Sequence, residues 1–193
     1  MSKYGDVRSG KIALVAHCIL NQNSIVPGLA RRQAMVKEVV DVLERYGIGI
    51  IQLPCPETLH SGLRRFWQVK EQYSSTGFKR LCRRLSRMIV DYVREYLRND
   101  YRLVLILGVA GSPSCGIRET NSSPKWFGDP RKAGNYVKIR ESGVFMEELI
   151  NSLRNAKLLS NDTILTDIDY SNISASVREL EGRLRDVLDK RHE

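Results

Sequence analysis

Four short apolar runs recur along the chain, with longer and more polar segments between them. The runs span residues 11–17, 48–53, 102–107 and 163–168. Apolar runs of this length, bounded by turn residues, are typical of strands that are buried on both faces of a parallel sheet. Strands that alternate with helices indicate a doubly wound sheet with helices on both faces. The pattern therefore predicts an α/β fold with a mainly parallel sheet, the three-layer sandwich of Rossmann and flavodoxin-like proteins.

The segments between the runs carry apolar residues at helical spacing. We expect helices at residues 33–46, 78–98 and 143–153, and a polar helix from residue 171 or 174 to residue 190. The apolar stripe of the longest helix is expected to be Leu81, Leu85, Met88, Ile89, Tyr92 and Tyr96. Residues 118–140 are rich in Gly, Pro, Asn and Ser and show no periodicity, which predicts a functional loop, a lid or a mobile insertion.

The chain length of 193 residues suits one domain. We expect an N-terminal lead over residues 1–10, the α/β domain over 11–170 and a C-terminal helix of the same domain over 171–193. No apolar run approaches the roughly 18–20 residues of a membrane span, and the first ten residues lack the apolar segment of a secretory signal. These features predict a soluble, cytoplasmic protein with no membrane partner, and they leave its oligomeric state open.

Basic residues outnumber acidic residues by 31 to 22, which gives a formal net charge of +9. Part of the excess lies on one face of the predicted helix at 78–98, and Arg64, Arg65, Arg131 and Lys132 add to it. A solvated surface is the ordinary explanation of such charge. The alternative is a patch that follows phosphate groups, but the sequence has no known RNA-binding motif. Nucleic acid is therefore only weakly supported as a partner.

Three of the four cysteines follow successive apolar runs. Cys18 comes directly after the first run, Cys55 shortly after the second and Cys115 a few residues after the third. Right-handed crossovers place the carboxyl ends of parallel strands at one edge of the sheet, where ligands bind in such folds. We therefore expect these three thiols in one crevice, although they are 37 and 60 residues apart. Cys82 lies within the predicted long helix and is expected in the core.

Three thiols at one sheet edge have more than one interpretation. They are either separate buried cysteines or soft ligands that leave one position of a metal or an iron–sulfur cubane open. A site with three protein ligands is more typical of reaction or substrate binding than of structure. Zinc with His17 or His60 as the fourth ligand is a minor alternative. His17 adjoins Cys18 on chain that is predicted to be extended, so their side chains are expected on opposite faces.

The cysteines stand in short motifs that resemble those of the DUF523 family, whose characterised members are 2-thiouracil desulfidases (desulfurases). The family has Cys-Leu-Leu-Gly after its first strand, Cys-Pro-Glu after its second and Ser-Pro-Ser-Cys-Gly after its third. The corresponding segments here are residues 18–21 (Cys-Ile-Leu-Asn), 55–57 (Cys-Pro-Glu) and 112–116 (Ser-Pro-Ser-Cys-Gly). The last two motifs are intact, and the resemblance extends over about residues 11–160.

The resemblance implies a [4Fe-4S] cluster held by the three motif cysteines, with one iron left open. It also implies a non-redox desulfidase reaction, in which the open iron binds the sulfur of a thiocarbonyl and water replaces that sulfur on carbon. A thiouracil-like base or a thio-modified nucleotide is the expected substrate. Glu57, two residues after Cys55, is the candidate general base. Ser112 and Ser114 are candidate hydrogen-bond donors to cluster sulfur or substrate oxygen.

The chain departs from the family pattern in two segments that would face the substrate. Residues 21–28 lack the family's Gly and Arg-Tyr-Asp-Gly run, and residues 58–67 lack its Gly-Gly-Leu-Pro stretch. Our hypothesis is that this chain binds the edge of a heterocycle with other polar side chains, the amides by hydrogen bonding. The candidate substrate-binding residues are Asn21, Gln22, Asn23 and His60.

Other functions stay open at the level of sequence. One is a non-catalytic metal- or cluster-binding protein, or a regulatory protein of the same fold. Another is a Cys-dependent hydrolase or transferase that uses Cys115 with a histidine. A phosphate-binding loop at residues 108–116 is a weak option, because the segment lacks the required Lys and glycine spacing.

Overall fold

The computed structural model describes residues 5–189, and its main sheet has four parallel strands. In spatial order these are β2 (Gly49–Gln52), β1 (Lys11–Val15), β3 (Arg102–Val109) and β6 (Ile164–Ile168). β1 pairs with β2 and with β3, and β3 pairs with β6, all in parallel. The apolar run that forms β3 lies in the centre of the sheet, with seven of its eight residues buried.

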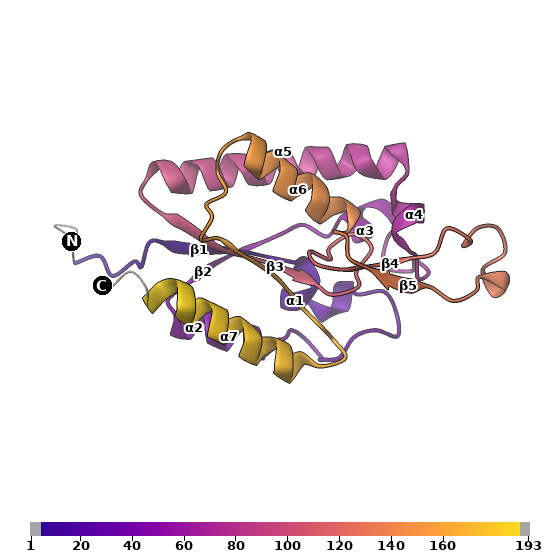
Figure 1. Cartoon of the computed structure of the whole chain (residues 1–193), viewed down its shortest axis with the longest axis horizontal. Helices are drawn as coiled ribbons and strands as arrows, with labels where there is room; N and C mark the ends of the chain where they lie inside the picture. Colours follow the sequence, from indigo (N-terminus) through magenta and orange to yellow (C-terminus); the bar gives the residue numbers. More distant parts are fainter. Residues whose placement is uncertain (1–4, 190–193) are drawn as a thin grey trace.

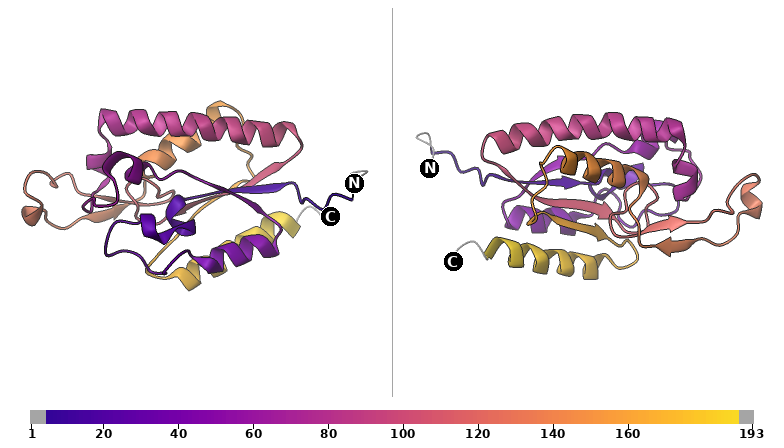
Figure 2. Two further views of the ribbon diagram at one scale, coloured as in Figure 1. Left: turned by 180° about the vertical axis from the view of Figure 1, so that it is seen from behind. Right: turned by 45° about the horizontal axis from the view of Figure 1, so that its top comes forward.

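Helices cover both faces of this sheet. α5 (Thr76–Arg98) and α6 (Val144–Asn155) pack together on one face, and α2 (Lys37–Arg45) and α7 (Ile173–Asp189) cover the other (Figures 1 and 2). The buried apolar side chains of the strands and helices form one core between these layers. The predicted α/β fold, with a parallel sheet between two helical layers, is therefore confirmed. The expected end of the last helix at residue 190 lies outside the described residues.

The buried face of α5 differs from the predicted stripe. Met88 and Tyr92 are 45% and 55% exposed. The buried side is instead formed by Phe78, Cys82, Leu85, Ser86, Ile89, Val90 and Val93. α5 contacts both α6 and the sheet. The side of α5 that faces these two neighbours includes small residues such as Cys82 and Ser86, whereas Met88 and Tyr92 lie at its margin and are exposed to water. Cys82 is fully buried on this side, which confirms its predicted place in the core.

Short helices form where the sequence predicts only loops. They are α1 (His17–Leu20), η1 (Gln22–Ser24), α3 (Pro56–Ser61), α4 (Lys70–Tyr73) and η2 (Pro130–Lys132). Such elements are too short for a periodic signal. His17 and Cys18 accordingly lie on the first turn of a helix, so the prediction of extended chain at these residues was wrong.

Residues 118–140, which are predicted to form a functional loop, a lid or a mobile insertion, contain a short hairpin that the sequence does not predict. β4 (Thr120–Ser122) pairs with β5 (Val137–Ile139) in an antiparallel hairpin. The hairpin and the loop at its tip project beyond the carboxyl end of the main sheet (Figures 1 and 2). Two strands of three residues show too little alternation to be recognised from sequence.

Within residues 5–189, no helix combines the length and the apolar character that a membrane span requires.

Candidate functional site

A cavity of about 310 Å³ opens where the strands of the main sheet end. Cys18, Cys55 and Cys115 all line it, together with Glu57 and residues 109–115 after β3. Tyr170, two residues beyond β6, also lines it. The parallel sheet thus brings together the three thiols that the sequence placed after its first three strands, whereas Cys82 lies in α5.

Each of these cysteines is held by a different local structure. Cys18 is the second residue of α1. Cys55 is the N-cap of α3, and its Sγ accepts a hydrogen bond from the backbone N–H of Thr58 at 3.4 Å. Cys115 is tied to the end of β3, because its carbonyl accepts from the N–H of Val109 at 3.0 Å. Backbone structure therefore positions each thiol.

A hydroxyl group lies within hydrogen-bond distance of each of the three sulfur atoms. Cys18 Sγ accepts from the Tyr170 hydroxyl at 3.3 Å. Cys55 Sγ accepts from Thr58 Oγ1 at 3.2 Å. Ser114 Oγ lies 3.3 Å from Cys115 Sγ, but it donates its single proton to Glu57 Oε1 at 2.6 Å. Hydroxyl donors of this kind stabilise sulfur that carries negative charge, as in a thiolate bound to a metal.

Burial opposes ionisation of two of these thiols. It raises the pKa of Cys18 to about 12, and the negative charges of Cys55 and Glu57 add to the effect. Burial also raises the pKa of Cys115 well above its ordinary value, with further contributions from the other two cysteines and Glu57. Neutral thiols are therefore the stable form of Cys18 and Cys115 near pH 7, unless a positively charged group enters the cavity.

Glu57 lies in the first turn of α3, and both of its carboxylate oxygens are engaged. Oε1 accepts a hydrogen bond from Ser114 Oγ at 2.6 Å. Oε2 accepts from Arg65 Nε at 2.9 Å, in an ion pair whose Arg65 and Glu57 side chains are 3% and 12% exposed. The carboxylate is thus fixed in orientation beside the three thiols.

Arg65 is a site residue that the sequence analysis missed. Its expected place on a solvated or phosphate-binding surface was wrong, because the residue is buried. Besides Glu57, its guanidinium donates to the carbonyl of Gly62 at 3.1 Å and to that of Ser24 at 2.8 Å. It therefore ties α3 to the end of η1. A buried carboxylate needs a cationic partner. If Glu57 is expected at a buried site, the nearby Arg65 is therefore a candidate for its partner, and this was the signal available in the sequence.

Two tyrosines, the buried Tyr73 and the half-buried Tyr170, line the cavity as well. Burial raises the pKa of Tyr170 well above its ordinary value, and the charge of Cys18 raises it further. Burial likewise raises the pKa of Tyr73, with an added contribution from Glu57. Both side chains are phenols near neutral pH and act only as neutral hydrogen-bonding groups.

The Ser-Pro-Ser-Cys-Gly loop is packed tightly against the start of α6. Ser112 Oγ accepts from the N–H of Cys115 at 3.0 Å and lies 3.4 Å from Ser114 Oγ. The Ser114 carbonyl accepts from two N–H groups at the start of α6. A side chain at Gly116 would collide with the backbone of Glu119. Gly116 is therefore required by contact within the protein.

The structure does not bring the predicted substrate-binding residues to the cavity wall. The Gln22 amide donates to the Cys18 carbonyl at 2.7 Å and accepts from the Arg31 N–H at 2.9 Å. Asn21 Oδ1 accepts from the Asn23 backbone and side chain, each at 3.1 Å. His60 is exposed, with its ring edge-on to Phe78. A role in substrate binding stays a prediction for these four residues.

Several unpredicted residues line the cavity instead. Asn121 is the most informative, because its Oδ1 is buried and has no hydrogen-bond partner among the described residues. An unpaired buried acceptor is destabilising by about 1–3 kcal/mol unless a ligand satisfies it. Aromatic side chains form much of the remaining wall: Phe66, Trp67, Tyr73, Trp126, Tyr136 and Tyr170.

The arrangement of potential metal ligands and histidines bears on two of the functions that the sequence left open, metal binding and catalysis by a cysteine nucleophile. Over residues 5–189, no group of three or more His, Cys, Asp or Glu side chains is arranged to hold a metal ion. Neither His17 nor His60 lines the cavity, so no described histidine is placed to activate Cys115. The [4Fe-4S] cluster and the zinc alternative both stay predictions.

Comparison with known proteins agrees with the motifs. "Uncharacterized protein MJ0003" of Methanocaldococcus jannaschii is 41% identical over 111 residues, which are 58% of this chain and 70% of that protein. No solved structure matches the chain significantly. A family model described as "Putative 2-thiouracil desulfurase" matches residues 10–177, a span that includes Cys18, Cys55, Glu57 and Cys115. The chain therefore belongs to that family.

Proposed function

We propose that the protein removes sulfur from a thiolated heterocycle in a hydrolytic, [4Fe-4S]-dependent reaction. The observation that carries the proposal is the convergence of Cys18, Cys55 and Cys115 on one cavity with a buried carboxylate, Glu57. The reaction converts C=S and water into C=O and hydrogen sulfide, and no electrons are exchanged with another molecule. The description of the family supports desulfurase activity at this coarser level.

The donor set fits a cubane cluster. The three sulfurs are soft ligands, each with a hydroxyl group within hydrogen-bond distance, and the fourth cysteine lies apart from them in the buried face of α5. In a cubane each cysteine binds a different iron, so the three thiols need not converge on a single ion. Cys18, Cys55 and Cys115 would hold such a cluster with one iron open. When bound, it supplies a soft Lewis acid that polarises C=S and takes up the departing sulfide.

Glu57 is the group that can accept the proton of the attacking water. Its carboxylate lines the cavity and is oriented from both sides, by Ser114 on Oε1 and by Arg65 on Oε2. Each carboxylate oxygen has a second acceptor site, so water can bind while these two hydrogen bonds persist. Ser112 Oγ, close to Ser114 Oγ, extends the hydroxyl network along the same wall.

Asn121 and the aromatic side chains of the wall are suited to hold the substrate. The unpaired Asn121 Oδ1 can accept a hydrogen bond from the ring N–H that neighbours C=S in a thiouracil-like base. Planar heterocycles pack well on aromatic rings. A volume of about 310 Å³ is at the small end of ligand pockets and suits one such ring.

The test is anaerobic reconstitution, followed by measurement of iron, acid-labile sulfide and sulfide release from 2-thiouracil and 4-thiouracil. We expect about four irons per chain by the stoichiometry of the cluster. Cys18→Ala, Cys55→Ala and Cys115→Ala should each lose it, and Cys82→Ala should keep it. Wild-type protein that binds no iron, or that binds iron equally well in all four variants, would show that the proposal is wrong.

A further inference from the structure

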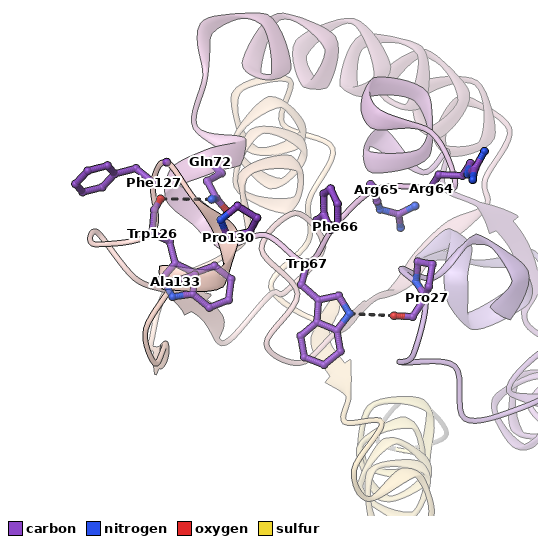
Figure 3. A pocket seen from close by; sticks show the side chains of 11 residues that line it. Pro27, Arg64, Arg65, Phe66, Trp67, Gln72, Trp126, Phe127, Pro130 and Ala133 are labelled. Atoms are coloured by element: carbon purple, nitrogen blue, oxygen red, sulfur yellow. Dashed lines mark hydrogen bonds between the residues drawn. The ribbon is translucent and has the colours of Figure 1, made fainter.

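A second hollow, of about 470 Å³, shares part of its wall with the cysteine cavity. Arg65, Phe66, Trp67 and Trp126 line both. One wall of this aromatic groove is the segment after α3, which carries Phe66 and Trp67, and the other is the tip of the β4–β5 hairpin, which carries Trp126 (Figure 3). The groove therefore adjoins the site of the proposed chemistry.

Large aromatic rings in the groove are open to water. Phe66 is 76% exposed, Trp67 is 47% exposed and Phe127, on the hairpin tip, is 82% exposed. The two indole rings are nevertheless anchored: Trp67 Nε1 donates to the Pro27 carbonyl at 3.0 Å, and Trp126 Nε1 donates to that of Gly134 at 2.6 Å (Figure 3 shows the first of these). Exposed but anchored rings are suited to stacking with planar groups of a ligand.

The charge around the groove favours an anionic ligand. Its lining includes arginine and no Asp or Glu. Arg64 in the groove, Arg31 on the cavity wall and Lys125 at the hairpin tip are exposed, and none of them pairs with a carboxylate of residues 5–189. Asp129, next to the groove, is paired with Arg131. The aromatic groove is thus bordered by cations without acidic partners.

We propose that the aromatic groove binds single-stranded nucleic acid, with unpaired bases stacked on Phe66 and the two tryptophans and phosphates beside Arg64. Stacking faces flanked by cations are the features that bind single strands without sequence preference. The groove extends well beyond a cavity that suits one heterocycle, so it offers binding sites for nucleotides next to the reacting base. Binding of the strand is independent of the proposed function. The further step, in which the strand presents a thiolated base to the cysteines, rests on the proposed function.

The probe is an unmodified, fluorescein-labelled uridine octamer of RNA, titrated with the full-length protein and followed by anisotropy. Both tryptophans of the chain line the groove, so quenching of intrinsic fluorescence gives a second readout. Phe66→Ala should weaken binding by roughly fivefold to a hundredfold, the effect expected for one lost base stack. Arg64→Gln should also weaken it and lower the dependence of log affinity on log salt by about one unit. Tyr92→Ala, which removes an exposed ring on α5, should bind as the wild type does.

Three outcomes would overturn the proposal. Phe66→Ala with wild-type affinity would mean that the basic protein holds RNA by charge alone. Equal competition by uridine monophosphate would mean that only a mononucleotide site exists, and equal competition by a fully paired RNA duplex would rule out stacking. Because the probe contains no sulfur, failure here is separable from failure of the desulfidase. A protein that releases sulfide from free 4-thiouracil but does not bind the octamer would contradict only this inference.

Discussion

Ser114 Oγ donates a 2.6 Å hydrogen bond to Glu57 Oε1, which joins the loop after β3 to the helix after β2. The same hydroxyl lies 3.3 Å from the sulfur of Cys115, so one side chain touches both the carboxylate and a thiol. Arg65 holds the other oxygen of Glu57. This arrangement places a fixed carboxylate next to the cysteines and leads to the following predictions.

Glu57→Gln should abolish most sulfide release and leave the cluster in place. The amide cannot accept the proton of the attacking water, and loss of a general base typically lowers the rate by about 10²–10⁴-fold. The measurement is sulfide release from a thiolated base, with iron content and circular dichroism of the same sample as controls. Release at the wild-type rate would remove Glu57 from the reaction.

Arg65→Ala should destabilise the protein by about 3–5 kcal/mol, because it leaves the carboxylate of Glu57 buried without its cationic partner. Thermal or urea unfolding measures the effect. Arg65→Lys should recover only part of the stability, since a single ammonium cannot reproduce the three contacts of the guanidinium. The matched control is Arg64→Ala at the neighbouring exposed residue, which should change stability by no more than about 0.5 kcal/mol. Equal effects at both positions would contradict the buried ion pair.

Tyr170→Phe should make the reduction potential of the reconstituted cluster more negative. The hydroxyl donates a hydrogen bond to Cys18 Sγ. Loss of a hydrogen bond to a ligand sulfur makes addition of an electron to the cluster less favourable. A redox titration followed by electron paramagnetic resonance measures the shift. Tyr92→Phe, at an exposed ring on α5, is the control and should leave the potential unchanged. Equal potentials in all three proteins would show that Tyr170 does not act on the cluster.

Asn121→Ala should raise KM for a thiolated base more than it lowers kcat. Oδ1 of Asn121 is a buried acceptor without a partner among residues 5–189, so the variant loses a contact that only the substrate satisfies. Folding should not suffer, because no internal hydrogen bond of this oxygen is lost. Steady-state kinetics of sulfide release separate the two constants. An unchanged KM would exclude this residue from substrate binding.

Gly116→Ala should destabilise the protein by about 1–3 kcal/mol, the usual effect of overpacking. Its new Cβ would collide with the backbone of Glu119, which cannot move as a side chain can. Gly77→Ala in the first turn of α5 is the contrasting variant, because nothing lies near its Cβ and alanine favours a helix. Unfolding midpoints of the two variants should therefore shift in opposite directions.

Most of the fold could be read from the sequence because its signals are local. The buried strands appear as apolar runs, and the main helices appear as amphipathic segments between them. The elements that were missed, such as α3 and the β4–β5 hairpin, are too short to repeat a periodic pattern often enough to be recognised. They nevertheless carry Glu57 and position Trp126 at the cavity wall, so the local structure around the site was less predictable than the sheet.

The sequence alone determined that Cys18, Cys55 and Cys115 meet, because parallel strands with right-handed crossovers bring their carboxyl ends to one edge whatever the loops do. Only the tertiary structure decided which side chains complete the site. Arg65 and Tyr170 come from irregular segments and Asn121 from the short strand β4, and their directions depend on contacts with parts of the chain that are distant in sequence. A local sequence pattern shows whether a residue is apolar or polar. The hydrogen-bond partner of a buried polar atom depends on which distant segments of the chain pack around that atom.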